Sequence, residues 1–213
     1  MADGPDIGTI ACVILAGGKS SRMGVEKALV MLGGTPLVVR AIARLRNQVG
    51  KLVISSNGDT DRFRACGIPV VADIVPDCGP AGGLLAGLRW AQSEGASFLL
   101  TVACDTPFFP EDLAFRLAQA IKGRGGRTAV ARSGEHDHYT FALHPTGCVD
   151  ELESWLILPE HRSLRHWIAG QQPVSVDFEG NPDPFFNINT PMDLALAETW
   201  VSAFEKYTAA GPK

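Results

Sequence analysis

The most constraining feature of this chain is an apolar segment that runs directly into a glycine-rich, cationic turn. The segment at 9–15 has the composition of a buried strand, and the turn after it contains Gly17, Gly18, Arg22, Gly24 and Lys27. Glycine lets backbone N–H groups approach an anion closely, and the two cations add the positive charge that phosphate oxygens require. This arrangement predicts a site for a triphosphate.

Two commoner phosphate-binding motifs do not fit the turn. Gly18-Lys19-Ser20 could end a Walker A loop, but the leading glycine of that motif would fall at Val13, inside the strand. A dinucleotide fingerprint needs G-x-G-x-x-G, whereas Gly17 and Gly18 are adjacent. The remaining alternative is a tight strand-to-helix connection whose charges are only solvated.

Apolar runs alternate with amphipathic stretches along the chain, which predicts an α/β fold with a mostly parallel central sheet and helices on both faces. The expected strands cover 9–15, 51–56, 68–72, 97–103, 127–131, 139–144, 174–178 and 185–188. The expected helices cover 36–49, 84–94, a segment that starts near 110, 152–158, 164–169 and 191–207. Thr35 and Pro36 are expected to start the first helix, and the turn-rich segment 76–83 is expected to be an irregular substrate loop.

Size and composition predict one ordinary domain. The chain has 213 residues, of which 46% are hydrophobic and 20% charged. We expect a single Rossmann-like domain at 9–207 between flexible ends at 1–8 and 208–213. The net charge of −4 argues against a general nucleic-acid binder. Since no apolar run approaches the roughly 20 residues of a membrane span and the first residues lack a basic signal region, a cytoplasmic location is expected. We also expect a monomer.

Polar residues follow three of the predicted parallel strands. Asn57, Asp73 and Asp105 each stand just after a strand, as does the glycine-rich turn. Ligands of open α/β sheets bind at the carboxyl ends of the strands, so these residues are expected to converge. A carboxylate beside a triphosphate is consistent with bound Mg²⁺, which prefers oxygen ligands. The alternative is that each aspartate only caps the next turn or helix, and that Asn57-Gly58 is an ordinary turn.

Three segments together resemble the molybdenum cofactor guanylyltransferases, which transfer GMP from GTP to molybdopterin. They are the Leu-Ala-Gly-Gly run at 15–18 with Arg22 and Lys27, the Cys-Asp-Thr-Pro segment within 102–107, and the segment 187–194. The first segment occurs in many nucleotidyltransferases, whereas the three together are more selective. The resemblance covers nearly the whole chain and implies a Rossmann-like nucleotidyltransferase fold.

The resemblance also implies a role for each matching residue. The residues implied to bind GTP are Leu15, Ala16, Gly17, Gly18, Lys27, Asn57, Asp73 and Asp105. Of these, the first four would line the guanine pocket and turn, Lys27 would contact phosphate, and Asp105 would hold Mg²⁺ as the cofactor. Arg22 would join Lys27 and Asp105 in catalysis by steadying the triphosphate or the pyrophosphate that leaves.

On the acceptor side, the resemblance implies that Asn187 and Asn189 contact molybdopterin, while a plain strand-end turn is the alternative for both. It further implies transient docking to proteins of cofactor insertion or molybdoenzyme maturation. Related cytidylyltransferases typically have Leu-Ala-Ala-Gly and Cys-Asp-Gln-Pro where this chain has Gly17 and Thr106, and both differences favour guanine. Glu26, where the family usually has Asp, and Tyr139, where Pro is common, depart from the pattern.

Three alternatives stay open at this stage. A molybdopterin cytidylyltransferase would differ in the nucleotide it selects, and a sugar-phosphate nucleotidyltransferase in the acceptor. A nucleotide-binding regulatory module would bind without turnover, but the presence of both Lys27 and Asp105 argues against it.

Overall fold

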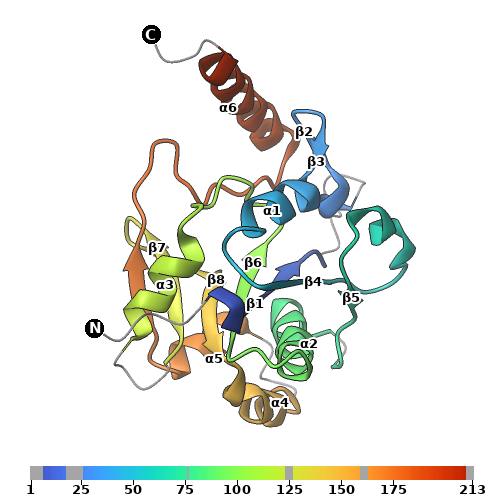
Figure 1. Cartoon of the computed structure of the whole chain (residues 1–213), viewed down its shortest axis with the longest axis vertical. Helices are drawn as coiled ribbons and strands as arrows, with labels where there is room; N and C mark the ends of the chain where they lie inside the picture. The colour runs from blue at the N-terminus through green and yellow to red at the C-terminus, as the bar shows by residue number, and fades with distance from the viewer. Residues whose placement is uncertain (1–6, 18–25, 76, 123–126, 159–162, 210–213) are drawn as a thin grey trace.

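A computed structural model describes residues 7–17, 26–75, 77–122, 127–158 and 163–209 (Figure 1). Its centre is a seven-stranded sheet in the order β5-β4-β1-β6-β8-β7-β9. The strands of this sheet are β1 (Ile10–Leu15), β4 (Lys51–Ser55), β5 (Val70–Val71), β6 (Phe98–Ala103), β7 (Ala129–Ser133), β8 (His136–Pro145) and β9 (Val174–Asp177). Only β8 runs against its neighbours within this described sheet, so the predicted, mostly parallel α/β fold is confirmed.

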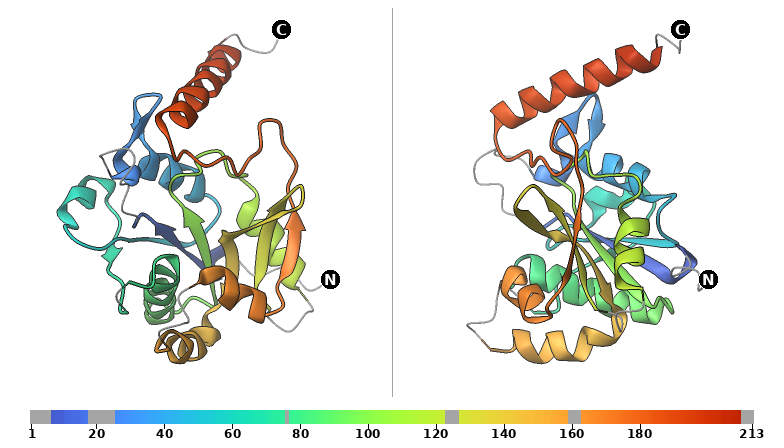
Figure 2. Two further views of the ribbon diagram at one scale, coloured as in Figure 1. Left: turned by 180° about the vertical axis from the view of Figure 1, so that it is seen from behind. Right: turned by 90° about the vertical axis from the view of Figure 1, so that its left-hand side faces the viewer.

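Helices cover both faces of the sheet, as predicted (Figure 2). On one face lie α1 (Leu37–Leu45) and α3 (Leu113–Ile121), and on the other lie α2 (Pro80–Ser93), α4 (Val149–Leu156) and α5 (Leu164–Gly170). All six residues of β1 are buried, and they alternate between the two apolar clusters. A strand enclosed on both sides explains the continuous apolar run that precedes the turn.

The order of the strands sets the position of a binding site. The chain passes from β1 to β4 and β5 on one side, then returns to β6 on the other side of β1. The register pairs Leu15 with both Ser55 and Ala103, so the carboxyl ends of β1, β4 and β6 are level. The reversal of strand order beside β1 is the place where open α/β sheets bind ligands.

Helix α2 lies close to β1 because glycines face the strand. A Cβ at Gly87 would stand 2.8 Å from the Cβ of Val13, and a Cβ at Gly83 would stand 2.7 Å from a methyl of Leu15. Only glycine allows so close an approach at these two positions.

The prediction of an irregular loop at 76–83 is partly wrong, because helix α2 already begins at Pro80. A proline at the first helical position loses no hydrogen bond, because that N–H has no partner within the helix.

A small hairpin precedes α1, and the sequence prediction missed it. Its strands are β2 (Met31–Leu32) and β3 (Thr35–Pro36), joined by Gly33 and Gly34 at φ +54° and +68°. Two consecutive residues with positive φ favour a tight hairpin turn. Thr35 and Pro36 thus belong to a strand rather than to the start of the helix, and α1 runs only from Leu37 to Leu45.

The segment expected as a strand at 185–188 is not one. It lies in a loop between β9 and α6 (Pro191–Ala209), where its aromatic side chains pack instead of forming a ladder. Phe185 contacts the rings of Phe141 and Phe178, and Phe186 contacts Trp200. Side-chain packing, which periodicity along the chain does not report, holds this segment in place.

Helix α6 projects from the top of the molecule, beyond the β2–β3 hairpin (Figures 1 and 2). Ala197 and Val201 pack there against Leu32 and Leu37. The helix ends at Ala209, two residues later than expected. Short 3-10 helices complete the fold at Ile7–Thr9 (η1), Lys27–Leu29 (η2), Asp61–Cys66 (η3) and Thr146–Cys148 (η4). Across the residues described, no helix is long and apolar enough to cross a membrane.

His144 on β8 should make folding stability depend on pH. Its side chain is fully buried, with Nδ1 3.4 Å from the Thr128 hydroxyl oxygen, and burial lowers its pKa to about 3. In the unfolded chain the imidazole binds a proton below its ordinary pKa of about 6.5. Stability is therefore present above that value and falls as pH drops from about 6.5 toward 3.

We expect wild type to lose about 2 kcal/mol more unfolding free energy than His144→Gln between pH 7.5 and 5. Urea titrations at both pH values measure the difference. His136→Gln, at an exposed position of the same strand, serves as the matched control and should behave as wild type. Equal acid sensitivity of wild type and His144→Gln would contradict the assignment.

Candidate active site

An ion pair joins the two groups expected to act on phosphate and metal. Lys27 begins η2, and Asp105 stands two residues after β6. The Lys27 Nζ donates to Asp105 Oδ2 at 2.9 Å, with side-chain exposures of 23% and 21%. The pair is thus partly shielded, which strengthens a charge-assisted hydrogen bond relative to one in open water.

The loop before α6 meets this ion pair. Lys27 Nζ also donates to Asn189 Oδ1, and the Thr106 hydroxyl donates to Asn187 Oδ1. Between the two asparagines, the Ile188 N–H donates to the carbonyl oxygen of Asp105 at 2.8 Å. Both asparagines expected on the acceptor side therefore lie beside the Asp105 segment, although no strand carries them.

The start of α6 holds Asn189 in position. The Asp193 carboxylate accepts the backbone N–H groups of Asn189 at 2.9 Å and Thr190 at 2.8 Å, while the Thr190 hydroxyl accepts the Asp193 N–H at 3.2 Å. These hydrogen bonds form a reciprocal cap at the start of the helix. The hydrogen bond from the Asn189 N–H is the largest cause of a lowered pKa at Asp193. The hydrogen bonds with Thr190 lower this pKa further, whereas burial raises it. Asp193 is therefore a charged anchor for the loop.

Asn57 and Asp73 form a second group, at the ends of β4 and β5. The Asn57 amide donates to Asp73 Oδ2 at 2.8 Å, and the Asp73 N–H donates to Asn57 Oδ1 at 2.9 Å. The Ser55 hydroxyl lies 3.4 Å from the other carboxylate oxygen. This pair stands on the opposite side of β1 from β6, which carries Asp105.

The end of β1 lies between the two groups. Leu15 and Ala16 are buried, and the Ala16 N–H donates to the Ser55 carbonyl at 2.9 Å. Gly17 is exposed, and a Cβ placed on it would meet no described atom within 4 Å. Gly18 and Arg22 fall outside the described residues. The exposed Gly17 thus stands between the Lys27–Asp105 pair on the β6 side of β1 and the Asn57–Asp73 pair on the β4 side.

Three contacts within the site were not predicted from the sequence. The role of Thr106 in holding Asn187 follows from contact across the fold and not from any local pattern. Arg62 in η3 bonds to the end of β4, as described below, and no motif marks it. Gly82 carried a partial signal as a turn former, but its contact with Asp73 depends on how closely α2 approaches the sheet.

Asp105 is the described residue best placed to hold a divalent cation. Its second carboxylate oxygen lies 3.5 Å from the Thr106 hydroxyl, while the first is occupied by Lys27. No group of three or more His, Cys, Asp or Glu side chains forms a metal site within the described ranges. A magnesium ion commonly takes one or two protein carboxylates and completes its shell with phosphates and water, so a single aspartate fits such an ion.

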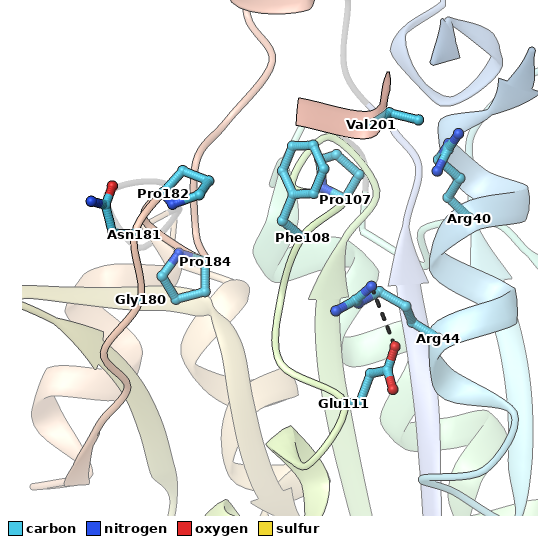
Figure 3. Close-up of a pocket in the computed structure, with 10 residues that line it drawn as sticks. All are labelled: Arg40, Arg44, Pro107, Phe108, Glu111, Gly180, Asn181, Pro182, Pro184 and Val201. Carbon is cyan, nitrogen blue, oxygen red and sulfur yellow. Dashed lines mark ion pairs between the residues drawn. The ribbon is translucent and has the colours of Figure 1, made fainter. Parts of the chain in front are cut away.

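A cavity of about 510 Å³ lies elsewhere, between α1, the loop after β6, the loop at 180–184 and α6 (Figure 3). Arg40, Arg44 and Phe108 line it, but none of the sequence-predicted site residues does. The Nε groups of both arginines donate to backbone carbonyls at 2.6 Å, and Arg44 is 3.5 Å from Glu111. These arginines connect α1 to β2 and to the loop after β6. The strand-end cluster, with its paired charges at the topological switch point, is the better active-site candidate.

Comparisons with known proteins identify the family of this chain. The sequence pattern of the MobA-like NTP transferase domain matches residues 12–175. The chain belongs to the MobA-like NTP transferase family. A molybdenum cofactor guanylyltransferase of Rhizobium meliloti (strain 1021) is 46% identical to this nucleotidyltransferase over 202 residues, which cover 91% of this chain and 92% of the relative. A molybdenum cofactor guanylyltransferase of Rhodobacter capsulatus is 47% identical, and the match covers 89% of this chain and 95% of that relative. The predicted family resemblance is confirmed.

The fold of this MobA-like NTP transferase is also found in solved structures. Molybdopterin-guanine dinucleotide biosynthesis protein A from Archaeoglobus fulgidus has a TM-score of 0.73 and 22% identity, covering 91% of this chain and 99% of that chain. At this identity the likeness concerns the fold alone. It supports the Rossmann-like nucleotidyltransferase architecture expected from the sequence.

Gly82 offers a test of the second group. In Gly82→Ala, the added Cβ would lie 2.8 Å from Asp73 Oδ2 and 2.9 Å from Cγ, so the carboxylate must move away from Asn57. We expect the affinity for GTP to fall about tenfold or more, because small displacements at a binding site are costly. Isothermal titration calorimetry on the folded variant measures this.

Gly170→Ala in α5 is the matched control, since a Cβ there meets no described atom within 4 Å. Its GTP affinity should equal that of wild type. If Gly82→Ala also bound GTP normally, Asp73 would not belong to the nucleotide site.

Proposed function

We propose that this MobA-like NTP transferase transfers GMP from GTP to molybdopterin in the presence of Mg²⁺. The products are molybdopterin guanine dinucleotide and pyrophosphate. The relatives named molybdenum cofactor guanylyltransferase support the reaction. The main structural support in this chain is that Lys27 contacts both Asp105 and Asn189 where the carboxyl ends of parallel strands lie level.

In the proposed complex, GTP spans the end of β1. The guanine base lies against Leu15, Ala16, Gly17 and Gly18, with Asn57 and Asp73 beside the nucleoside. The triphosphate extends toward Lys27, with Arg22 steadying the phosphates. Level strand ends and the exposed Gly17 between the two polar groups support this direction.

Lys27 and Asp105 neutralise each other without a ligand. When the triphosphate binds, the ammonium group would turn to phosphate oxygens, which releases the carboxylate of Asp105 to hold Mg²⁺. That ion, when bound, would supply positive charge for the phosphate oxygens that become more negative during transfer. The 2.9 Å contact brings the two charges close enough for this exchange with little movement of either backbone.

The acceptor is proposed to approach along Asn187 and Asn189. Its terminal phosphate forms a bond to the α-phosphorus of GTP, while the bond from that phosphorus to pyrophosphate breaks. Because the attacking phosphate is already anionic, no protein nucleophile is needed, and catalysis depends on position and charge stabilisation. Asn189 contacts Lys27 directly, which supports a junction of donor and acceptor at this point.

The proposal also includes a cytoplasmic monomer that passes its product to proteins of cofactor insertion or molybdoenzyme maturation. The resemblance to the guanylyltransferases is its support.

The deciding experiment supplies the protein with Mg²⁺, molybdopterin and each nucleoside triphosphate in turn. We expect dinucleotide and pyrophosphate from GTP, because Gly17 lets the backbone hydrogen-bond guanine and a mismatched base leaves those groups unpaired. Mass spectrometry identifies the product. Equal or preferred use of CTP would favour a molybdopterin cytidylyltransferase. Transfer only to a sugar phosphate would favour a sugar-phosphate nucleotidyltransferase. Binding without pyrophosphate release would indicate a regulatory module.

Asp105→Ala and Lys27→Ala each remove one charge from the reacting centre. We expect kcat to fall about 10²- to 10³-fold or more, as for the loss of one preorganised electrostatic contact. Steady-state pyrophosphate release measures the effect. Asp150→Asn on α4, where 83% of the side chain is exposed, is the control and should be active. Near-normal transfer by Asp105→Ala would remove the metal assignment.

A further inference from the structure

Arg62 connects two segments of the candidate site that are distant in sequence. It lies in η3, and its side chain is 28% exposed. One terminal nitrogen pairs with Glu26 Oε2 at 2.8 Å. The other donates to the Ser56 hydroxyl at 3.0 Å and the Asn57 carbonyl at 2.8 Å. We call these four residues the Arg62 bridge.

Each end of the Arg62 bridge leads directly to a site residue. Glu26 precedes Lys27 and stands at the N-terminus of η2, where its side chain makes no capping hydrogen bond and pairs with Arg62 instead. At the other end, the bridge holds the backbone of Asn57, whose side chain makes two hydrogen bonds to Asp73. Arg62 thus links the Lys27 segment to the Asn57–Asp73 group.

The surroundings of the bridge differ from those of a solvated surface pair. Glu26 is only 19% exposed, and the Arg62 guanidinium also lies 5.3 Å from the ring centre of fully buried Phe63. Burial raises the pKa of Glu26, while Arg62 lowers it and Asp59 raises it. Arg62 therefore opposes the effect of burial on this carboxylate. Arg64, two residues on, is 82% exposed and pairs with Asp61 within its own helix.

We propose that Arg62 and Glu26 are positioning residues that set the distance between Lys27 at the phosphate end and Asn57–Asp73 at the nucleoside end of bound GTP. The inference rests on the proposed function. A planar guanidinium can hold a carboxylate on one side and a hydroxyl and a carbonyl on the other, whereas an ammonium group has no such fixed fork. The geometry of arginine, and not charge alone, is what the bridge requires.

The test compares Arg62→Gln, Arg62→Lys and Glu26→Gln with Arg64→Gln as the matched control. For each variant, calorimetry measures GTP affinity, pyrophosphate release measures kcat and KM, and thermal unfolding measures stability. We expect kcat/KM to fall about tenfold to a hundredfold in Arg62→Gln, as displacements near 1 Å can do. Arg62→Lys should be closer to Arg62→Gln than to wild type, and Arg64→Gln should match wild type.

The double variant Glu26→Gln/Arg62→Gln separates positioning from general destabilisation. If the two residues act through one contact, the double variant loses little more kcat/KM than either single variant, because the losses of coupled residues are not additive. Additive losses would overturn the proposal. So would a normal kcat/KM in folded Arg62→Gln and Arg62→Lys, even with a lowered Tm. If wild type itself made no guanine dinucleotide, the proposed function would fail, and GTP affinity across the same variants would still test the bridge.

Discussion

The candidate site depends on one interaction, in which Lys27 neutralises the carboxylate of Asp105 at the carboxyl ends of several parallel strands. Level carboxyl ends of β1, β4 and β6 bring Asp105 to the edge of the sheet, on the far side of β1 from Asp73. Polyanionic substrates would be repelled from an edge with carboxylates alone. Lys27 pairs with Asp105 at 2.9 Å, so one cation can compensate the carboxylate before binding and the phosphates afterwards.

The packing of α2 and the loop before α6 gives this edge its shape. Gly83 and Gly87 let α2 approach β1, which brings the start of the helix beside Asp73. On the other side, Asp193 accepts the backbone N–H groups of Asn189 and Thr190, and the Asn189 side chain accepts from Lys27. Core packing and site geometry are therefore coupled, because the same glycines and caps that order the fold also position the polar groups.

The sequence was sufficient for those features that local patterns encode. The buried run of β1 and the alternation of strands and helices were predicted and are observed. Contacts between distant segments could not be read in this way. Periodicity suggested a strand at 185–188, but ring packing around Phe185 holds it as a loop, and the Arg62 bridge spans residues 26 to 62 without any motif. Gly18 and Arg22 lie outside the described residues and stay predictions.

A crystal structure with Mg²⁺ and a GTP analogue that resists cleavage after the α-phosphate tests the central claim most directly. We expect a metal about 2.1 Å from an Asp105 carboxylate oxygen. We also expect Lys27 Nζ to contact a phosphate instead of Asp105, and the base to lie against Gly17. A nucleotide bound in the cavity beside Arg40 and Arg44, with the Lys27–Asp105 pair still closed, would contradict it.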